Sequence, residues 1–90
     1  MRTTISARHC EISDELRERA GTVLERLTAL VSRPVDGTIV FDVAAQLQTV
    51  EIRIHSSTGE LFVATAEEKD HRTALDRAEE VDQGVHVVGA

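Results

Sequence analysis

The chain has 90 residues, with 10 basic and 16 acidic side chains and a formal net charge of −6. That length supports one small hydrophobic core, and a hydrophobic content of 41% argues against a disordered chain. The excess of acidic residues excludes a general long-range attraction to nucleic-acid phosphates. A single cysteine, Cys10, excludes an internal disulfide. No signal peptide or membrane span is expected, because the first residues are polar and no apolar run approaches ~20 residues, so we expect a cytoplasmic protein.

The first elements expected are a short strand and a long helix. Thr3 to Ala7 alternate as a strand does, and Ser13 can cap a helix whose first turn carries Asp14 and Glu15, where the helix dipole favours negative charge. Apolar residues then recur at helical spacing: Leu16, Ala20, Val23, Leu24, Leu27, Leu30 and Val31. This pattern predicts one amphipathic helix that continues to Val31.

Three strands should follow that helix. Residues 32–37 form a dense turn signal, and 45–48 form a weak connector. The expected strands are 38–44, 49–55 and 61–66, with a hairpin turn at 56–60 between the last two. In the middle strand Val50, Ile52 and Ile54 should point inward, while Glu51, Arg53 and His55 should point outward.

A second helix is expected from the Glu67–His71 segment through about Asp82, with Ala74, Leu75, Ala78 and Val81 as its apolar side. The predicted fold is α+β with the order βαβββα. It is a two-layer sandwich with both helices on one face of a four-stranded, mainly antiparallel sheet. The residues expected in its core are Ile5, Leu16, Val23, Leu27, Phe41 or its neighbour Val40, Ile52, Val63 and Leu75.

We place a single domain at residues 1–82 and a tail at 83–90. Gln83-Gly84 should stop the second helix, and the tail is equally consistent with an extra strand and with a disordered end. A strand there would offer an edge through which the chain could form a homodimer.

Side chains with catalytic or metal-binding chemistry are present but not in a recognisable pattern. The four histidines (His9, His55, His71 and His86) match no zinc spacing, and Cys10 directly follows the first of them. Cys10 fits a small buried residue better than a nucleophile. Without a glycine-rich phosphate loop or an acid/base pair, we expect no enzyme activity, no metal and no cofactor.

Three segments together carry a family resemblance: Glu11-Ile12-Ser13-Asp14-Glu15-Leu16-Arg17, Val50–Ile54 followed by a turn and Leu61–Glu68, and Asp70–Asp76. In this order and spacing they resemble the ribosome hibernation-promoting factors, also called ribosome-associated inhibitors. The resemblance covers about residues 1–78.

The resemblance implies a βαβββα domain that binds the small ribosomal subunit in the channel for messenger and transfer RNA. Such binding would block translation under stress. It further implies that basic groups contact ribosomal RNA, and the matching positions here are Arg8, Arg26, Arg53, Lys69, Arg72 and Arg77.

The end of the second helix departs from the family pattern. Where the family has a Lys/Arg-rich stretch, this chain has the acidic Ala78–Asp82. Two hypotheses of different classes therefore stand. One is a ribosome-binding hibernation factor, and the other is an acidic protein-interaction module that kept the fold and lost the RNA surface.

Some of the basic residues also have a purely structural interpretation. Arg19 and Arg26 share one flank of the first helix, as a phosphate grip or as an ordinary solvated helix face. Arg53 could equally pair with Glu51 on its own strand.

Overall fold

The computed structural model describes residues 2–80 and 86–89 of the chain. It contains two helices among short and long strands, in the order β1 (Arg2–Ala7), α1 (Asp14–Thr28), β2 (Pro34–Ala44), β3 (Leu47–Ser56), β4 (Glu60–Glu68), α2 (His71–Glu80) and β5 (His86–Gly89). The element order βαβββα predicted from the sequence is therefore confirmed. β5 follows it as a further short strand.

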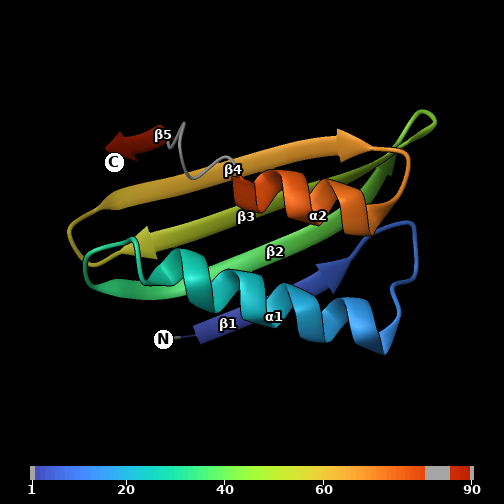
Figure 1. Ribbon diagram of the computed structural model, residues 1–90. Coiled ribbons are helices and arrows are strands. Elements are labelled where there is room, and N and C mark those ends of the chain that lie inside the picture. The colour runs from blue at the N-terminus through green and yellow to red at the C-terminus, as the bar shows by residue number, and fades with distance from the viewer. Residues whose placement is uncertain (1, 81–85, 90) are drawn as a thin grey trace.

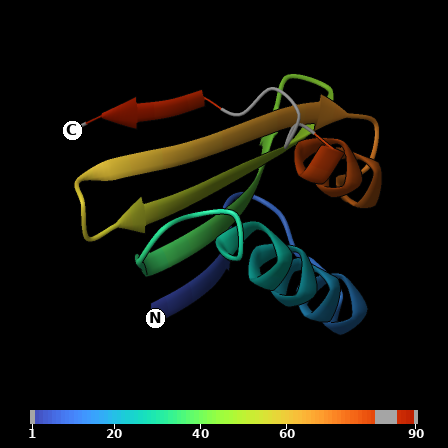
Figure 2. The same cartoon turned by 60° about the vertical axis from the view of Figure 1, so that its left-hand side comes forward.

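All strands join one sheet in the order β1-β2-β3-β4-β5. β1 pairs with β2 in parallel, and every other neighbouring pair is antiparallel. The parallel pair needs a crossover connection, which α1 provides. Both helices lie on the same face of the sheet and leave the other face open (Figure 1; Figure 2). The predicted α+β fold with both helices on one face is confirmed.

One consequence of this topology is that β1, β2 and β4 run in the same direction and finish at the same border of the sheet. We call this border, with residues 8–13, 45–46 and 69–72 beyond it, the loop end. Both helices also begin there, since α1 starts at Asp14 and α2 at His71 (Figure 1).

The core lies between the helices and the sheet. Alternate residues of β2, β3 and β4 face the helices, so that Ile39, Ile52 and Ala64 stand side by side across three strands and are all buried. The helices contribute buried residues from one stripe each: Ala20, Val23, Leu24 and Leu27 from α1, and Ala74, Leu75 and Ala78 from α2. Burial of these stripes supplies the main driving force for the two-layer packing.

The strands are longer than the sequence predicted: β3 also includes Leu47, Gln48 and Ser56, and β4 begins at Glu60. Residues 34–37, expected as a turn, already belong to β2, because Pro34 begins the strand where its missing N–H is tolerated. Glu67 and Glu68, expected to lead into the second helix, extend β4 and pair with Thr49 and Gln48.

The expected extent of the first helix was also wrong. α1 ends at Thr28, and the amides of Leu30 and Val31 bond only three residues back, to Leu27 and Thr28. The helical stripe therefore stops at Leu27, and Leu30 is 60% exposed.

Among the expected core residues, Val63 was placed on the wrong face. Phe62 and Ala64 are buried under the helices, so Val63 between them points to the open face, where it stands next to Arg53. Of the two candidates in β2, Phe41 is the fully buried one. Ile5 and Leu16 pack against the core but are only partly buried. The predicted helix stop at Gln83-Gly84 lies outside the described residues.

Candidate nucleic-acid interface

The six basic residues predicted to contact RNA do not form one patch. Arg26 lies in the last turn of α1, Arg77 in the last turn of α2, and Arg53 on the open face of the sheet. Each of these three has an acidic partner: Arg26 with Glu79 at 3.3 Å, Arg53 with Glu51 at 3.5 Å and Arg77 with Glu68 at 3.7 Å. Their charges are therefore largely offset within the protein.

The other three predicted residues (Arg8, Lys69 and Arg72) belong to the loop end. All three are exposed, and none forms an ion pair within residues 2–79. Arg8 directly follows β1, whereas Lys69 and Arg72 flank the start of α2. Since β1 and β4 finish at the same border, the fold brings these uncompensated cations to one side of the molecule.

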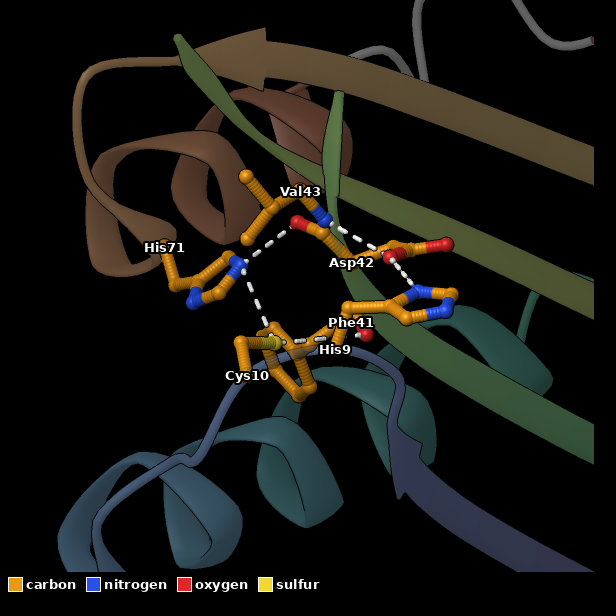
Figure 3. Close-up of polar contacts among 6 residues, drawn as sticks. All are labelled: His9, Cys10, Phe41, Asp42, Val43 and His71. Carbon is orange, nitrogen blue, oxygen red and sulfur yellow. Dashed lines mark hydrogen bonds and ion pairs between the residues drawn. The ribbon is translucent and has the colours of Figure 1, made fainter. Parts of the chain in front are cut away.

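A buried histidine holds the segments of the loop end together (Figure 3). His71 is 9% exposed, and its Nε2 donates a hydrogen bond to the backbone carbonyl oxygen of Asp42 at 2.9 Å. Its ring meets the ring of Phe41 edge to face, with 5.2 Å between centroids. Cys10 Sγ lies 4.0 Å from the same Nε2 and donates to the Phe41 carbonyl oxygen at 3.7 Å. We call Cys10, Phe41, Asp42 and His71 the histidine latch, because it joins the loop after β1, strand β2 and the start of α2.

The side chain of Asp42 extends this arrangement to the surface. Its Oδ1 accepts the backbone N–H of Val43 at 2.8 Å and contacts Nδ1 of His9 at 3.1 Å. These contacts, the Val43 N–H first and His9 second, hold the pKa of Asp42 below its ordinary value. His9 itself has a φ of 58°, a left-handed conformation that turns the chain after β1 and lets Cys10 reach the latch.

Both helices are capped at the loop end. Ser13 Oγ accepts the N–H of Leu16 at 3.1 Å, and Asp70 accepts the N–H of Thr73 at 2.8 Å and the Thr73 hydroxyl at 3.0 Å. These hydrogen bonds, from the N–H first and the hydroxyl second, lower the pKa of Asp70. The cap therefore fixes the short segment that carries Lys69 and Arg72.

A shallow cleft of about 360 Å³ separates the first turns of the two helices, and it is lined by Ser13, Glu15, Leu16, Arg19 and Arg72. Arg19 is committed to α2, because its Nε and Nη2 both donate to Asp76 Oδ1. The phosphate grip considered for Arg19 and Arg26 is thus replaced by two ion pairs that tie α1 to α2. Arg72 is the cation at this cleft that remains available to an anionic ligand.

The latch does not form a catalytic pair. Nε2 of His71 carries the proton that it donates to a carbonyl oxygen, so this nitrogen cannot deprotonate the Cys10 thiol. Burial, with a smaller contribution from the Asp42 charge, raises the pKa of Cys10 and keeps the thiol protonated. Among the described residues, no three His, Cys, Asp or Glu side chains are grouped to hold a metal ion.

Sequence reasoning predicted Arg8, Lys69 and Arg72 as RNA-binding residues but did not predict the contact between His71 and Asp42, which joins the start of α2 to β2. The only local signal was an apolar neighbourhood around each of them, with Phe41 and Val43 beside Asp42 and Ala74 and Leu75 after His71.

Neither of the described helices is long and apolar enough to cross a membrane.

Residues 3–81 match the family described as sigma 54 modulation protein / S30EA ribosomal protein. No functionally curated protein matched the sequence.

Two solved structures are similar to this chain. The N-terminal domain of Protein Y from Thermus thermophilus is 26% identical, with a TM-score of 0.71 and 89% of each chain covered. A ribosomal subunit interface protein from Coxiella burnetii is 20% identical, with a TM-score of 0.75, and the match covers 89% of this chain and 87% of that one. At 20% identity the second likeness supports the fold alone. Because the family match spans nearly the whole described chain, this protein belongs to the sigma 54 modulation protein / S30EA ribosomal protein family.

Proposed function

We propose that this protein is a ribosome-associated factor that binds ribosomal RNA of the small subunit and lowers translation in the cytoplasm under stress. The family name connects the fold with ribosomes, and so does the name of the similar Coxiella burnetii protein, a ribosomal subunit interface protein. The single observation that carries the proposal is the set of three uncompensated cations, Arg8, Lys69 and Arg72, held on capped and latched segments at the loop end.

The physical basis is charge placement rather than net charge. A guanidinium can donate two parallel N–H bonds to a phosphate, so Arg8 and Arg72 suit an RNA backbone. The positive ends of both helix dipoles also face the loop end, which favours an anion there. The net charge of −6 repels phosphate from the molecule as a whole. RNA should therefore approach through the loop end.

The small number of free cations predicts modest affinity. Each phosphate neutralised by a cation contributes roughly −0.7 to −0.9 to the slope of log affinity against log salt. Three contacts therefore predict a slope of about −2 to −3, with binding strong at low salt and weak at physiological salt.

Co-sedimentation with purified small ribosomal subunits at increasing salt tests this proposal. Single Gln substitutions at Arg8, Lys69 or Arg72 should each weaken pelleting and reduce the slope by about 1. Matched controls are Gln substitutions at Arg26, Arg53 and Arg77, whose charges are already paired and whose slopes should change little. Circular dichroism checks that every variant is folded.

Two outcomes would contradict the proposal. One is a wild-type chain that does not pellet with small subunits even at ~50 mM salt, where phosphate contacts are strongest. The other is an equal loss of binding for paired and unpaired cations, which would mean that the loop end is not the contact surface.

Block of translation follows if the bound domain fills the channel used by messenger and transfer RNA. An in vitro translation assay measures this separately from binding. The expected result is inhibition that is relieved by the Arg72→Gln substitution and kept by Arg77→Gln.

The second candidate function is an acidic protein-interaction module. It is favoured by the carboxylates on and before α1, which form no ion pair within residues 2–79: Glu11, Asp14, Glu15, Glu18 and Glu25. Absence of binding to small subunits at low salt would favour this module over the ribosome factor.

We also propose that residues 83–90 mediate a homodimer. β5 pairs with β4, so its outer side forms one border of the sheet and could pair with a second copy. Deletion of everything after Gln83 should convert a dimer to a monomer in sedimentation, whereas equal masses would remove this segment from an interface.

A further inference from the structure

The border of the sheet formed by β1 has the geometry of a strand-accepting edge. β1 pairs with β2 on one side, and no described strand pairs with its other side (Figure 1). The direction of its backbone groups follows from two contacts. The N–H of Arg8 donates to Phe41 O of β2 at 2.8 Å, while Ile5 O accepts a bond from the Arg17 side chain at 2.9 Å. Since backbone groups alternate along a strand, Thr4 and Ser6 point toward β2, and Thr3, Ile5 and Ala7 point outward.

The side chains of β1 do little to protect this edge. Between Arg2 and Arg8 the strand has no charged residue and no proline, the residues that usually block pairing by another strand. The one protective contact within the described chain is the Arg17 guanidinium on Ile5 O. By the same alternation the N–H groups of Thr3, Ile5 and Ala7 point away from β2, and they donate to no turn or loop among the described residues.

The chemistry of the neighbouring helix indicates which kind of strand would fit. Arg17 bonds to Ile5, and a Cβ on Gly21 would lie 4.0 Å from the Ile5 side chain, so this row of α1 lies along β1. Asp14 and Glu25 extend the same row by one turn at each end, because residues three or four apart are helix neighbours. Both are exposed and have no ion pair within residues 2–79. A strand added beside β1 would therefore place side chains near its two ends next to these carboxylates, with Arg17 between them.

We propose that the β1 edge binds an extended basic segment of a partner protein, which pairs with Thr3, Ile5 and Ala7 as an additional strand and displaces Arg17 from Ile5 O. Lysine or arginine at alternate positions of this segment faces Asp14 and Glu25, and uncharged residues lie beside Thr4 and Ser6 on the open face. Backbone hydrogen bonds provide the affinity and the carboxylates provide the choice of partner. The proposal is independent of RNA binding at the loop end.

A second copy of this chain fits the edge poorly. Pairing of two β1 strands would set two α1 helices along the same border, with Asp14 and Glu25 of each copy near those of the other. Like charges at such a contact oppose association. The free carboxylates of this row instead complement a cationic strand.

A nine-residue peptide with alternating Lys and Thr serves as the probe, and the same peptide with Glu for Lys is its control. NMR titration at low salt should shift the amides of Thr3, Ile5 and Ala7 more than those of Thr4 and Ser6. Hydrogen exchange of the three outward amides should slow on binding. The Glu peptide should not bind.

Two variants test strand pairing, and Thr3→Pro, which changes no charge, separates it from simple charge attraction. Thr3→Pro removes an outward N–H and keeps the hydrogen bonds to β2. It should weaken the affinity for the Lys peptide by roughly two- to tenfold, as expected for one lost hydrogen bond. Arg17→Met removes the competing donor and one adjacent positive charge, and it should tighten binding by a similar factor. Both variants are checked for unchanged circular dichroism.

The proposal is overturned if the Lys peptide binds wild type and both variants equally, because attraction would then not involve the strand edge. It also fails if the peptide shifts only α1 amides or does not bind at ~50 mM salt. If the Arg17→Met substitution alone gives a chain with the mass of a dimer, the occupant of the edge is a second copy. That result would contradict the proposal of a basic partner.

Discussion

The two faces of the sheet are made by the same strands but have opposite character. On the face under the helices, the neighbours Ile39, Ile52 and Ala64 are buried and apolar. One residue along, on the open face, Arg53 stands beside Glu51 along its own strand, and His55 Nδ1 lies 2.9 Å from Asp36 Oδ1. Alternation along each strand separates the part that stabilises the fold from the part that carries charge.

The basic residues also fall into two groups, according to whether they have an acidic partner. Arg53 on the open face and Arg26 and Arg77 in the last turns of the helices lie near acidic side chains and are paired. At the loop end, Arg8 and Lys69 lie in loops with no regular neighbour, so their charges stay available. Position in the fold, rather than the number of basic residues, thus decides which of these cations have an acidic partner.

The largest loss of stability is expected from a substitution in the core under the helices. Leu27→Ala removes a side chain that is 1% exposed and should lower the free energy of unfolding by about 2–5 kcal/mol. Leu30→Ala, three residues later but 60% exposed, should change it by less than about 0.5 kcal/mol. Urea unfolding of both variants measures this contrast, and equal losses would place Leu30 in the core.

The histidine latch should contribute less to the free energy of unfolding than the core does. His71→Ala leaves the Asp42 carbonyl oxygen without its donor and should cost about 1–3 kcal/mol in the free energy of unfolding. His55→Ala on the open face, where the histidine is exposed, should cost no more than about 0.5 kcal/mol. If His71→Ala is as mild as His55→Ala in urea unfolding, the latch does not stabilise the loop end.

Two glycines give a comparison in which the signs differ. A Cβ on Gly37 in β2 would lie 3.1 Å from a methyl group of Leu24, so Gly37→Ala should destabilise the protein by about 1–3 kcal/mol. Gly21 in α1 has only Ile5 at 4.0 Å, and Gly21→Ala should stabilise it by up to about 1 kcal/mol because alanine favours the helix. Thermal unfolding should show melting temperatures shifted in opposite directions.

The smallest expected effect is on stability in acid. The pKa values of Asp42 and Asp70 are lower in the folded protein than their ordinary value of 3.8. The stability they contribute is therefore fully present above about pH 4 and is lost as the pH falls through the lowered values. In urea unfolding between pH 5 and 2, Asp42→Asn and Asp70→Asn together should flatten this part of the pH dependence. If the stability of the double variant depends on pH as steeply as that of wild type, these two carboxylates do not supply the acid-sensitive stability.

The sequence by itself determined the element order, the two apolar helical stripes and the alternation that buries Ile52 and exposes Arg53. These features follow from local periodicity, so they can be recognised without knowing which elements meet. Local signals were weaker at boundaries. Pro34 and Glu67 were misassigned because a turn-like or acidic composition does not exclude a strand that has a neighbour to pair with.

Only the tertiary structure decided which charges are free and how the loop end is held. Asp42 and His71 are 29 residues apart, Arg26 and Glu79 are 53 apart, and Arg19 and Asp76 are 57 apart. The face on which Val63 lies likewise depends on the strand register, since a shift of one residue reverses it. Periodicity predicts that a side chain points outward, but the partner that neutralises it is set by contacts between distant segments.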